Sequence, residues 1–437
     1  MTASPNAATE AVGAPSHPHG AFDANEPPDL EGILDCMHCG ICLPQCPTYR
    51  VLGQEMDSPR GRVYLMRAVT EGRIGLTDNF LLHMDRCLGC RACETACPAG
   101  VPFGRLLEET RGQIERLASR PPSRRLLGRL VLGIFPNRRR LGTLLGATRL
   151  YQRSGLQRVV RGSGLLRRFR RLAAMEGLLP SLEGRPLAPL PAETLPLGAT
   201  RGTVALLEGC VQAVLFPEVN QATVALLARA GYRVLVPEHQ ACCGALHLHW
   251  GDRGAARELA RRNVAALAQA DWIVTNAAGC GAAMRDYGHL LPDDPEARAL
   301  AARVRDVSEL LAEGVPGPRH PLDLTVTYHD PCHLAHGQRV REAPRALLRA
   351  IPGLRLVDLV DSDLCCGSAG VYNLMEPEIA GQLLERKLDR IAATGAEVVA
   401  TGNPGCILQI RKGLAARGLK VRVHHPVELL AWSLEGA

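Results

Sequence analysis

The chain has 437 residues, of which 46% are hydrophobic and 22% charged, and its formal net charge is +7. This length predicts two or three domains, and the composition is that of ordinary globular proteins rather than of disordered or fibrous ones. Sixteen cysteines are the unusual feature, because so many thiols indicate either disulfides or bound metal.

Residues 1–28 are rich in alanine, proline and polar side chains and are expected to be a disordered tail. They have no apolar core of a secretory signal, and disulfide-dense chains are usually short and secreted. We therefore expect metal-bound thiolates in a reducing, cytoplasmic setting. No stretch of the sequence has the roughly 18 apolar residues that a membrane span needs. Peripheral attachment at the inner face of a membrane stays open.

Residues 29–110 are expected to form a helical domain. Ser58 followed by Pro59 is a typical helix start, a capping residue before a proline in the first turn. Apolar residues then recur at helical spacing from Val63 to Val69. A second helix is expected after Pro102.

Two cysteine motifs of the same spacing lie in this domain. They read CMHCGICLPQCP and CLGCRACETACP. Both match C-x₂-C-x₂-C-x₃-C-P, the bacterial ferredoxin run for [4Fe–4S] clusters, in which the fourth cysteine serves the other cluster of a pair. The predicted ligands of one cluster are Cys36, Cys39, Cys42 and Cys97, and those of the other are Cys87, Cys90, Cys93 and Cys46. Zinc fits less well, because it prefers two C-x₂-C pairs separated by a longer loop.

Residues 111–200 form an arginine-rich segment without cysteine. Between Arg111 and Arg171 there is one acidic residue, Glu115, and Leu and Val recur at roughly helical spacing. Three interpretations stay open: amphipathic helices that dock on an acidic partner subunit, helices at an anionic membrane surface, or a solvated basic face. Nucleic acid is not expected, because no recognition motif or interleaved aromatic residues accompany the charge.

Residues 201–315 and 316–437 are expected to be two copies of one module. Each copy runs strand, helix, strand, helix, strand, as in TVALLEGC, YRVLVPEHQACCG and WIVTNAAGC of the first. Strands that alternate with helices predict crossover connections and a parallel sheet. The fold class expected for the whole chain is therefore a mixed, multidomain one, with a helical two-cluster domain followed by two α/β modules with parallel strands.

The cysteines of each module fall where strands end and helices begin, which is where α/β sheets build their sites. The candidate metal ligands are Cys210, Cys242, Cys243 and Cys280 in the first module and Cys332, Cys365, Cys366 and Cys406 in the second. Thiolates select iron–sulfur clusters or zinc over hard cations. A further cluster in at least one copy is favoured, and a structural zinc or a metal-free thiol pair in one copy stays open as an alternative. Nearby histidines are candidates for lining a quinone or flavin-facing pocket: His247, His249, His329, His333 and His336.

Taken in order, these motifs resemble the glycolate oxidase iron–sulfur subunit family. The likeness covers about residues 30–435 and includes DSPRGRVYLM, LEGCVQ, ACCGA, AGCGA and LCCGSAG. The cysteine modules also resemble those of heterodisulfide reductase and of anaerobic glycerol-3-phosphate dehydrogenase subunits. The fuller pattern there ends in C-x-x-C, whereas this chain has Ala283 and Gln409 at the last position.

The resemblance implies an electron-transfer subunit that accepts electrons from FAD-binding flavoprotein subunits, where glycolate is oxidised to glyoxylate. The electrons would pass to a quinone or another acceptor. Because no Gly-rich dinucleotide fingerprint follows a strand, this chain is not expected to bind FAD or NAD, and no catalytic residue is assigned. The alternatives are a D-lactate or glycerol-3-phosphate dehydrogenase subunit, and a reductase that uses its cysteine modules directly on thiols or quinones.

Overall fold

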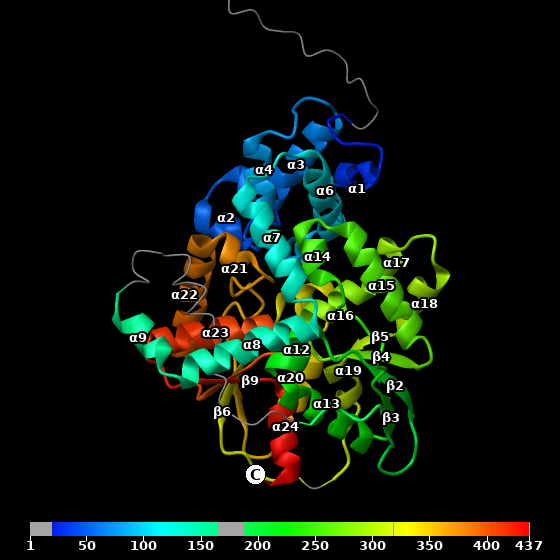
Figure 1. Cartoon of the computed structure of the whole chain (residues 1–437), viewed down its shortest axis with the longest axis vertical. Helices are drawn as coiled ribbons and strands as arrows, with labels where there is room; N and C mark the ends of the chain where they lie inside the picture. The colour runs from blue at the N-terminus through cyan, green and yellow to red at the C-terminus, as the bar shows by residue number, and fades with distance from the viewer. Residues whose placement is uncertain (1–19, 165–187, 318, 437) are drawn as a thin grey trace, which may run out of the picture.

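The structure, a computed structural model, describes residues 20–164, 188–317 and 319–436. The predicted tail at 1–28 therefore falls largely outside the described residues. The described chain has a helical N-terminal part at one end and two α/β modules at the other (Figure 1). The mixed fold class expected from the sequence is confirmed.

The N-terminal part consists of short helices around a small apolar core. Its helices are α1 (Leu30–Leu34), α2 (Pro47–Leu52), α3 (Pro59–Thr70), α4 (Asp78–Asp85), α5 (Ala92–Ala96) and α6 (Phe103–Leu117), with a 3₁₀ turn at Glu55–Asp57. Helix α3 begins as expected, because the Ser58 side chain accepts a hydrogen bond from the Gly61 amide and Pro59 opens the first turn. Pro47 likewise opens α2 directly after Cys46, which turns the chain away from the first motif.

Three helices follow in the arginine-rich segment: α7 (Pro122–Ile134), α8 (Arg138–Arg153) and α9 (Leu156–Gly162). Helix α7 contacts α14 and helix α8 contacts α12, so both lie along the first module (Figure 1). Arg120 and Arg124 donate to Asp85 at 2.8–2.9 Å, which ties the start of this segment to α4. Part of the basic charge thus forms ion pairs within the chain, a role outside the three interpretations of this segment.

Each module contains one sheet, and the two sheets share a strand order apart from one additional edge strand in the first. The first has β1 (Glu193–Thr194), β2 (Gly202–Leu206), β3 (Tyr232–Leu235), β4 (Trp272–Thr275) and β5 (Val304–Asp306), in the order β1-β3-β2-β4-β5. The second has β6 (Thr325–Tyr328), β7 (Arg355–Val357), β8 (Val398–Ala400) and β9 (Arg422–His424), in the order β7-β6-β8-β9. All pairings recorded between these strands are parallel except that of the edge strand β1. The expected repeat is therefore present, and β1, β5 and β9 are additions to the predicted strands.

Helices cover the sheets and join the two modules. The first module has α12 (Cys210–Leu215), α13 (Pro217–Arg229), α14 (Ala245–Trp250), α15 (Arg253–Leu267), α16 (Ala278–Arg285), α17 (Tyr287–Leu290), α18 (Pro295–Arg303) and α19 (Val307–Ala312). The second has a π-helical turn (His333–Gly337), α20 (Glu342–Arg349), α21 (Tyr372–Met375), α22 (Pro377–Ala393), α23 (Pro404–Ala416) and α24 (Pro426–Glu435). Contacts of α13 with α24 and of α19 with α20 close one apolar core shared by both modules.

Candidate metal centres

The four cysteines predicted to bind the first cluster lie together near the surface of the N-terminal part. Burial raises the pKa of Cys36, and the nearby thiols of Cys97 and Cys39 raise it further. Burial also raises the pKa of Cys42 to about 11, with Cys36 among the neighbours that add to the shift. Cys97 therefore lies beside the first motif although it belongs to the second. Cys39 is exposed.

The second set lies deeper, and Cys46 lies among its thiols. Burial raises the pKa of Cys93, and the thiols of Cys90, Cys87 and Cys46 add to the effect. This neighbourhood and that of Cys97 are the arrangement that crossed ligation requires. The donor chemistry fits [4Fe–4S] clusters, because each group offers four thiols. The assignment of the eight ligands stays a prediction.

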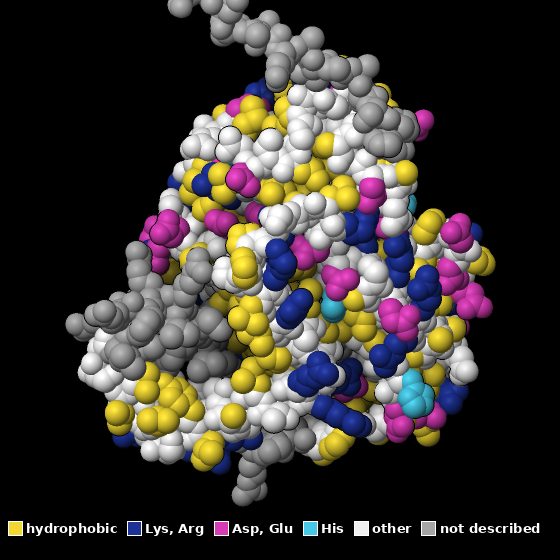
Figure 2. Space-filling model, turned by 45° about the horizontal axis from the view of Figure 1, so that its top comes forward, with side chains coloured by type: hydrophobic (Ala, Val, Ile, Leu, Met, Phe, Trp, Pro, Cys, Tyr) yellow, Lys and Arg dark blue, Asp and Glu magenta, His cyan; other side chains and the backbone are white. Residues whose placement is uncertain are grey.

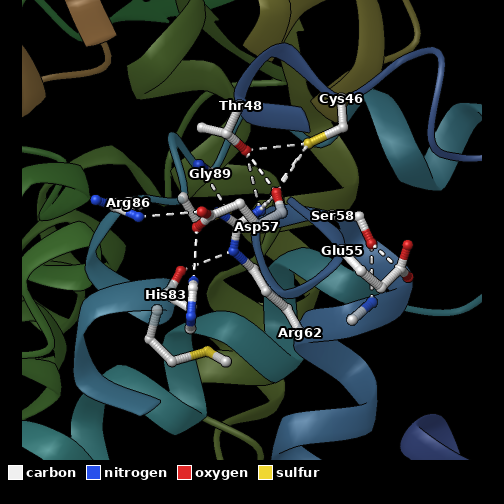
Figure 3. Close-up of polar contacts among 12 residues, drawn as sticks. Cys46, Thr48, Glu55, Asp57, Ser58, Arg62, His83, Arg86 and Gly89 are labelled. Carbon is white, nitrogen blue, oxygen red and sulfur yellow. Dashed lines mark hydrogen bonds and ion pairs between the residues drawn. The ribbon is translucent and has the colours of Figure 1, made fainter. Parts of the chain in front are cut away.

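A buried charge network surrounds Cys46 (Figure 3). The Arg62 guanidinium donates to the Asp57 carbonyl at 2.6 Å and to the Thr48 hydroxyl at 3.1 Å, and it lies 3.9 Å from the Cys46 sulfur. The Asp57 carboxylate also contacts the His83 ring at 2.9 Å. Arg62 and Asp57 are both 0% exposed. Burial by itself lowers the pKa of Arg62, but the Cys87 and Cys46 thiols and Asp57 raise it above its usual value.

Arg86, directly before the second motif, and Arg91, within it, both form ion pairs. Arg86 donates to the Asp57 carboxylate at 3.2 Å, and Arg91 donates to Asp286 of the first module at 2.6 Å. The ion pairs rule out simple solvation and show Arg91 as a bridge between the motif and the first module.

The four cysteines of the first module lie together at the carboxyl ends of its strands. The sulfurs of Cys210 and Cys242 are 3.4 Å apart, and Cys243 contacts both Cys242 and Cys280. The Cys-Cys turn is held from outside, because the Asn263 amide donates to the Cys242 carbonyl at 3.1 Å and the Tyr287 hydroxyl to the Cys243 carbonyl at 2.9 Å. This set offers four thiols to one centre.

The second module gathers its cysteines in the same way. Cys332 contacts Cys365, Cys365 contacts Cys366, and Cys366 contacts Cys406. The glycine that follows each Cys-Cys pair has a φ of +86°, and a side chain at Gly367 would meet the Ala380 carbonyl at 2.6 Å. A glycine is therefore required there.

A buried lysine that the cysteine pattern does not predict lies beside this set. The Lys387 ammonium donates to the Asp361 carbonyl at 2.6 Å and to the Ser362 carbonyl at 3.3 Å. Burial lowers its pKa to about 8, against the opposing influence of the Cys366 and Cys365 thiols. The Lys387 ammonium and these two thiols therefore lie close enough to influence each other's charge.

The candidate histidines do not share one pocket. His249 and His333, whose rings are 5.2 Å apart, line a small cavity between the second motif and the two modules. Its volume of about 20 Å³ holds a water molecule, not a quinone ring. His247 instead pairs with Asp252 at 3.0 Å, and His336 contacts Thr95 at 3.0 Å. The fifth, His329, lies among the thiols of the second module.

Sequence comparisons agree with this arrangement. The family described as "4Fe-4S dicluster domain" matches residues 32–101, and "Cysteine-rich domain" matches residues 204–285 and 326–411. The family "Glycolate oxidase iron-sulfur subunit, linker region" matches residues 123–179. No helix in the described part of the chain has the length and apolar character needed to span a membrane.

Curated relatives extend over most of the chain. A probable glycolate oxidase iron–sulfur subunit of Bacillus subtilis (strain 168) is 41% identical, covering 91% of this chain and 93% of its own. The glycolate oxidase iron–sulfur subunit of Escherichia coli (strain K12) is 37% identical, covering 92% and 94%. Lactate utilization protein A of Shouchella clausii (strain KSM-K16) is 31% identical but covers 52% of this chain and 98% of its own. The chain therefore belongs to the glycolate oxidase iron–sulfur subunit family.

Proposed function

We propose that this chain is the iron–sulfur electron-transfer subunit of a glycolate-oxidising complex. The observation that carries the proposal is the packing of the second motif on the second module. Leu88 and Cys90 share one apolar cluster with Cys332 and Cys365, and Cys332 is among the charges that raise the pKa of buried Cys90. The thiols thus form a nearly continuous series from exposed Cys39 to the interior, and bound [4Fe–4S] clusters would supply one-electron transfer along it.

The oxidation itself is assigned to a flavoprotein partner. Conversion of glycolate to glyoxylate releases two electrons and two protons, which a flavin can take together and pass on singly. The curated relatives are named as subunits, which supports at least one partner chain. The electrons would leave this chain toward a quinone or another acceptor.

Two surfaces suit such a partner. Around the first motif, Met37 is 82% exposed and Ile41 55% exposed, so an apolar surface lies over the cluster nearest to solvent. The linker helices expose further leucines, including Leu126 and Leu130 on α7. Lys and Arg side chains stand among hydrophobic ones on the face drawn in Figure 2. We assign the surface around the first motif to electron exchange and the linker helices to binding the partner subunit. The competing role for the linker is attachment to an anionic membrane, which binding to anionic vesicles would reveal.

The test is reduction by substrate. The chain is purified anaerobically with its flavoprotein subunits, glycolate is added, and the clusters are followed by EPR. We expect reduced [4Fe–4S] signals with glycolate and weaker ones with D-lactate, and loss of one signal in Cys87→Ala. Clusters that dithionite reduces but glycolate does not would refute the proposal. Stronger reduction by D-lactate would reassign the substrate.

A further inference from the structure

The two modules differ at one position beside their thiols. In the first, the Leu207 amide donates to the Val274 carbonyl at 3.0 Å, three residues before Cys210. In the second, the His329 amide donates to the Ala400 carbonyl at 3.0 Å, three residues before Cys332. These hydrogen bonds are equivalent, because each carbonyl lies six residues before the last cysteine of its module. Leucine in one copy is thus replaced by histidine in the other.

The His329 ring lies where a ligand would lie. A ring nitrogen and the sulfurs of Cys366 and Cys406 are all within 4.8 Å of one another. The side chain is 0% exposed, and neither ring nitrogen has an oxygen or nitrogen partner among the described residues, so the thiols of Cys366 and Cys406 are its polar neighbours. A buried imidazole without oxygen or nitrogen partners costs free energy unless a ligand satisfies it.

Other buried histidines of this module have partners. The His425 ring accepts from the Val427 amide at 3.2 Å and donates to the Asn276 carbonyl at 3.0 Å. The His336 ring contacts the Thr95 hydroxyl at 3.0 Å and the Asp363 carbonyl at 3.2 Å. The lack of partners is therefore particular to His329 rather than general for histidines of this fold.

We propose that His329 is a metal ligand and that the second module holds a mixed thiolate–imidazole centre. This inference deepens the proposed function by naming a donor that the cysteine pattern does not contain. The fuller cysteine pattern has a further thiol at the position of Gln409, but here that amide oxygen accepts a hydrogen bond from Asn373 at 3.0 Å. His329, which directly follows β6, supplies the additional donor. The metal is thiophilic, either iron in a cluster or zinc.

The first module lacks this donor, since Leu207 is 1% exposed and belongs to the apolar cluster that contains Cys210, Cys242 and Cys243. The two copies therefore present different donor sets, four thiols in one and four thiols with an imidazole in the other. We expect them to differ in metal or in the properties of the same metal.

The experiment compares His329→Leu, which copies the first module, with His336→Leu in the full chain, purified anaerobically from cells supplied with iron and zinc. We expect His329→Leu to lose the metal of one centre, either about one zinc or the iron of one cluster. His336→Leu should keep it. The EPR signals of the two ferredoxin-type clusters should persist in both variants. If these EPR signals were absent from the wild-type protein, the proposed function would be contradicted, but the assignment of His329 as a metal ligand would not.

A second measurement does not depend on the folding of a variant. Wild-type protein carrying ¹⁵N-labelled histidine is examined by pulsed EPR if the centre contains iron and by zinc-edge X-ray absorption if it contains zinc. We expect a histidine nitrogen coupled to the iron, or imidazole scattering around the zinc. A centre with sulfur ligands alone would overturn the proposal. So would a second module that takes up neither iron nor zinc, and so would a His329→Leu variant whose metal content is unchanged.

Discussion

Replacing Arg62 by methionine should lower the reduction potential of the cluster for which Cys46 is a predicted ligand. The buried guanidinium lies 3.9 Å from the Cys46 sulfur, and removing it takes away a positive charge that favours the reduced cluster. With the added electron about 7 Å from this charge and an effective dielectric constant of about 20, the interaction is about 2.4 kcal/mol. Since a tenfold change in a one-electron equilibrium is about 59 mV, this corresponds to about 100 mV. We therefore expect a shift of about 50–100 mV, reduced from the full value by nearby Asp57.

The assay is an EPR-monitored redox titration of the anaerobic protein. Arg67→Met on the same helix is the control, because its pair with Glu71 at 2.6 Å is more than a third exposed and screened by solvent. Asp57→Asn removes the opposite charge and should raise the same potential. A shift below about 20 mV in Arg62→Met, or a shift to higher potential, would contradict the electrostatic reasoning.

Three further predictions concern assembly and stability. Asp85→Asn should lower the free energy of unfolding by about 2–3 kcal/mol, because Arg120 and Arg124 lose their shared carboxylate. Thermal denaturation checks it against Asp389→Asn, whose 69% exposed carboxylate should matter by less than about 0.5 kcal/mol. Cys97→Ala should remove the cluster of the first motif, measured as the loss of about four irons and one EPR signal while the other remains. Burial lowers the pKa of His425 to about 4, so the unfolded chain binds a proton more readily as the pH falls through 6.5. The free energy of unfolding should therefore drop by about 2 kcal/mol between pH 7 and pH 5, and by less in His425→Gln. Urea denaturation of both proteins measures it, and midpoints that fall equally with pH in the wild type and the variant would contradict the prediction.

The parts of this fold that depend on local sequence could be predicted. Ser58 and Pro59 mark a helix start by a capping hydrogen bond and a fixed φ, and both act within one turn. The parallel strands follow from β-branched runs separated by helices, so β2, β4, β6 and β8 were expected where they occur. The edge strand β1 has two residues, too few for a periodic signal.

The charge network around Cys46 could not be predicted in the same way. Asp57 lies on the 3₁₀ turn and Arg62 on α3. His83 and Arg86 come from the end of α4, more than 20 residues later. Nothing local distinguishes a buried arginine from the many exposed ones, because burial depends on how α3 packs against the second motif. The signal that the sequence did offer for the network is that Arg62 follows the first motif closely along the chain.

The difference between Leu207 and His329 was visible in the sequence, because the two copies align from TVALLEGC to TVTYHDPC without a gap. The alignment could not show whether the imidazole is buried or hydrogen-bonded, because a single polar residue at the end of a strand can have many roles. The structure supplies the missing constraint: the ring is 0% exposed, lies beside two thiols and has no oxygen or nitrogen partner among the described residues. A duplicated site thus keeps its backbone hydrogen bonds and its four thiols in both copies, while a single exchange beside β6 changes the donors that a metal would meet.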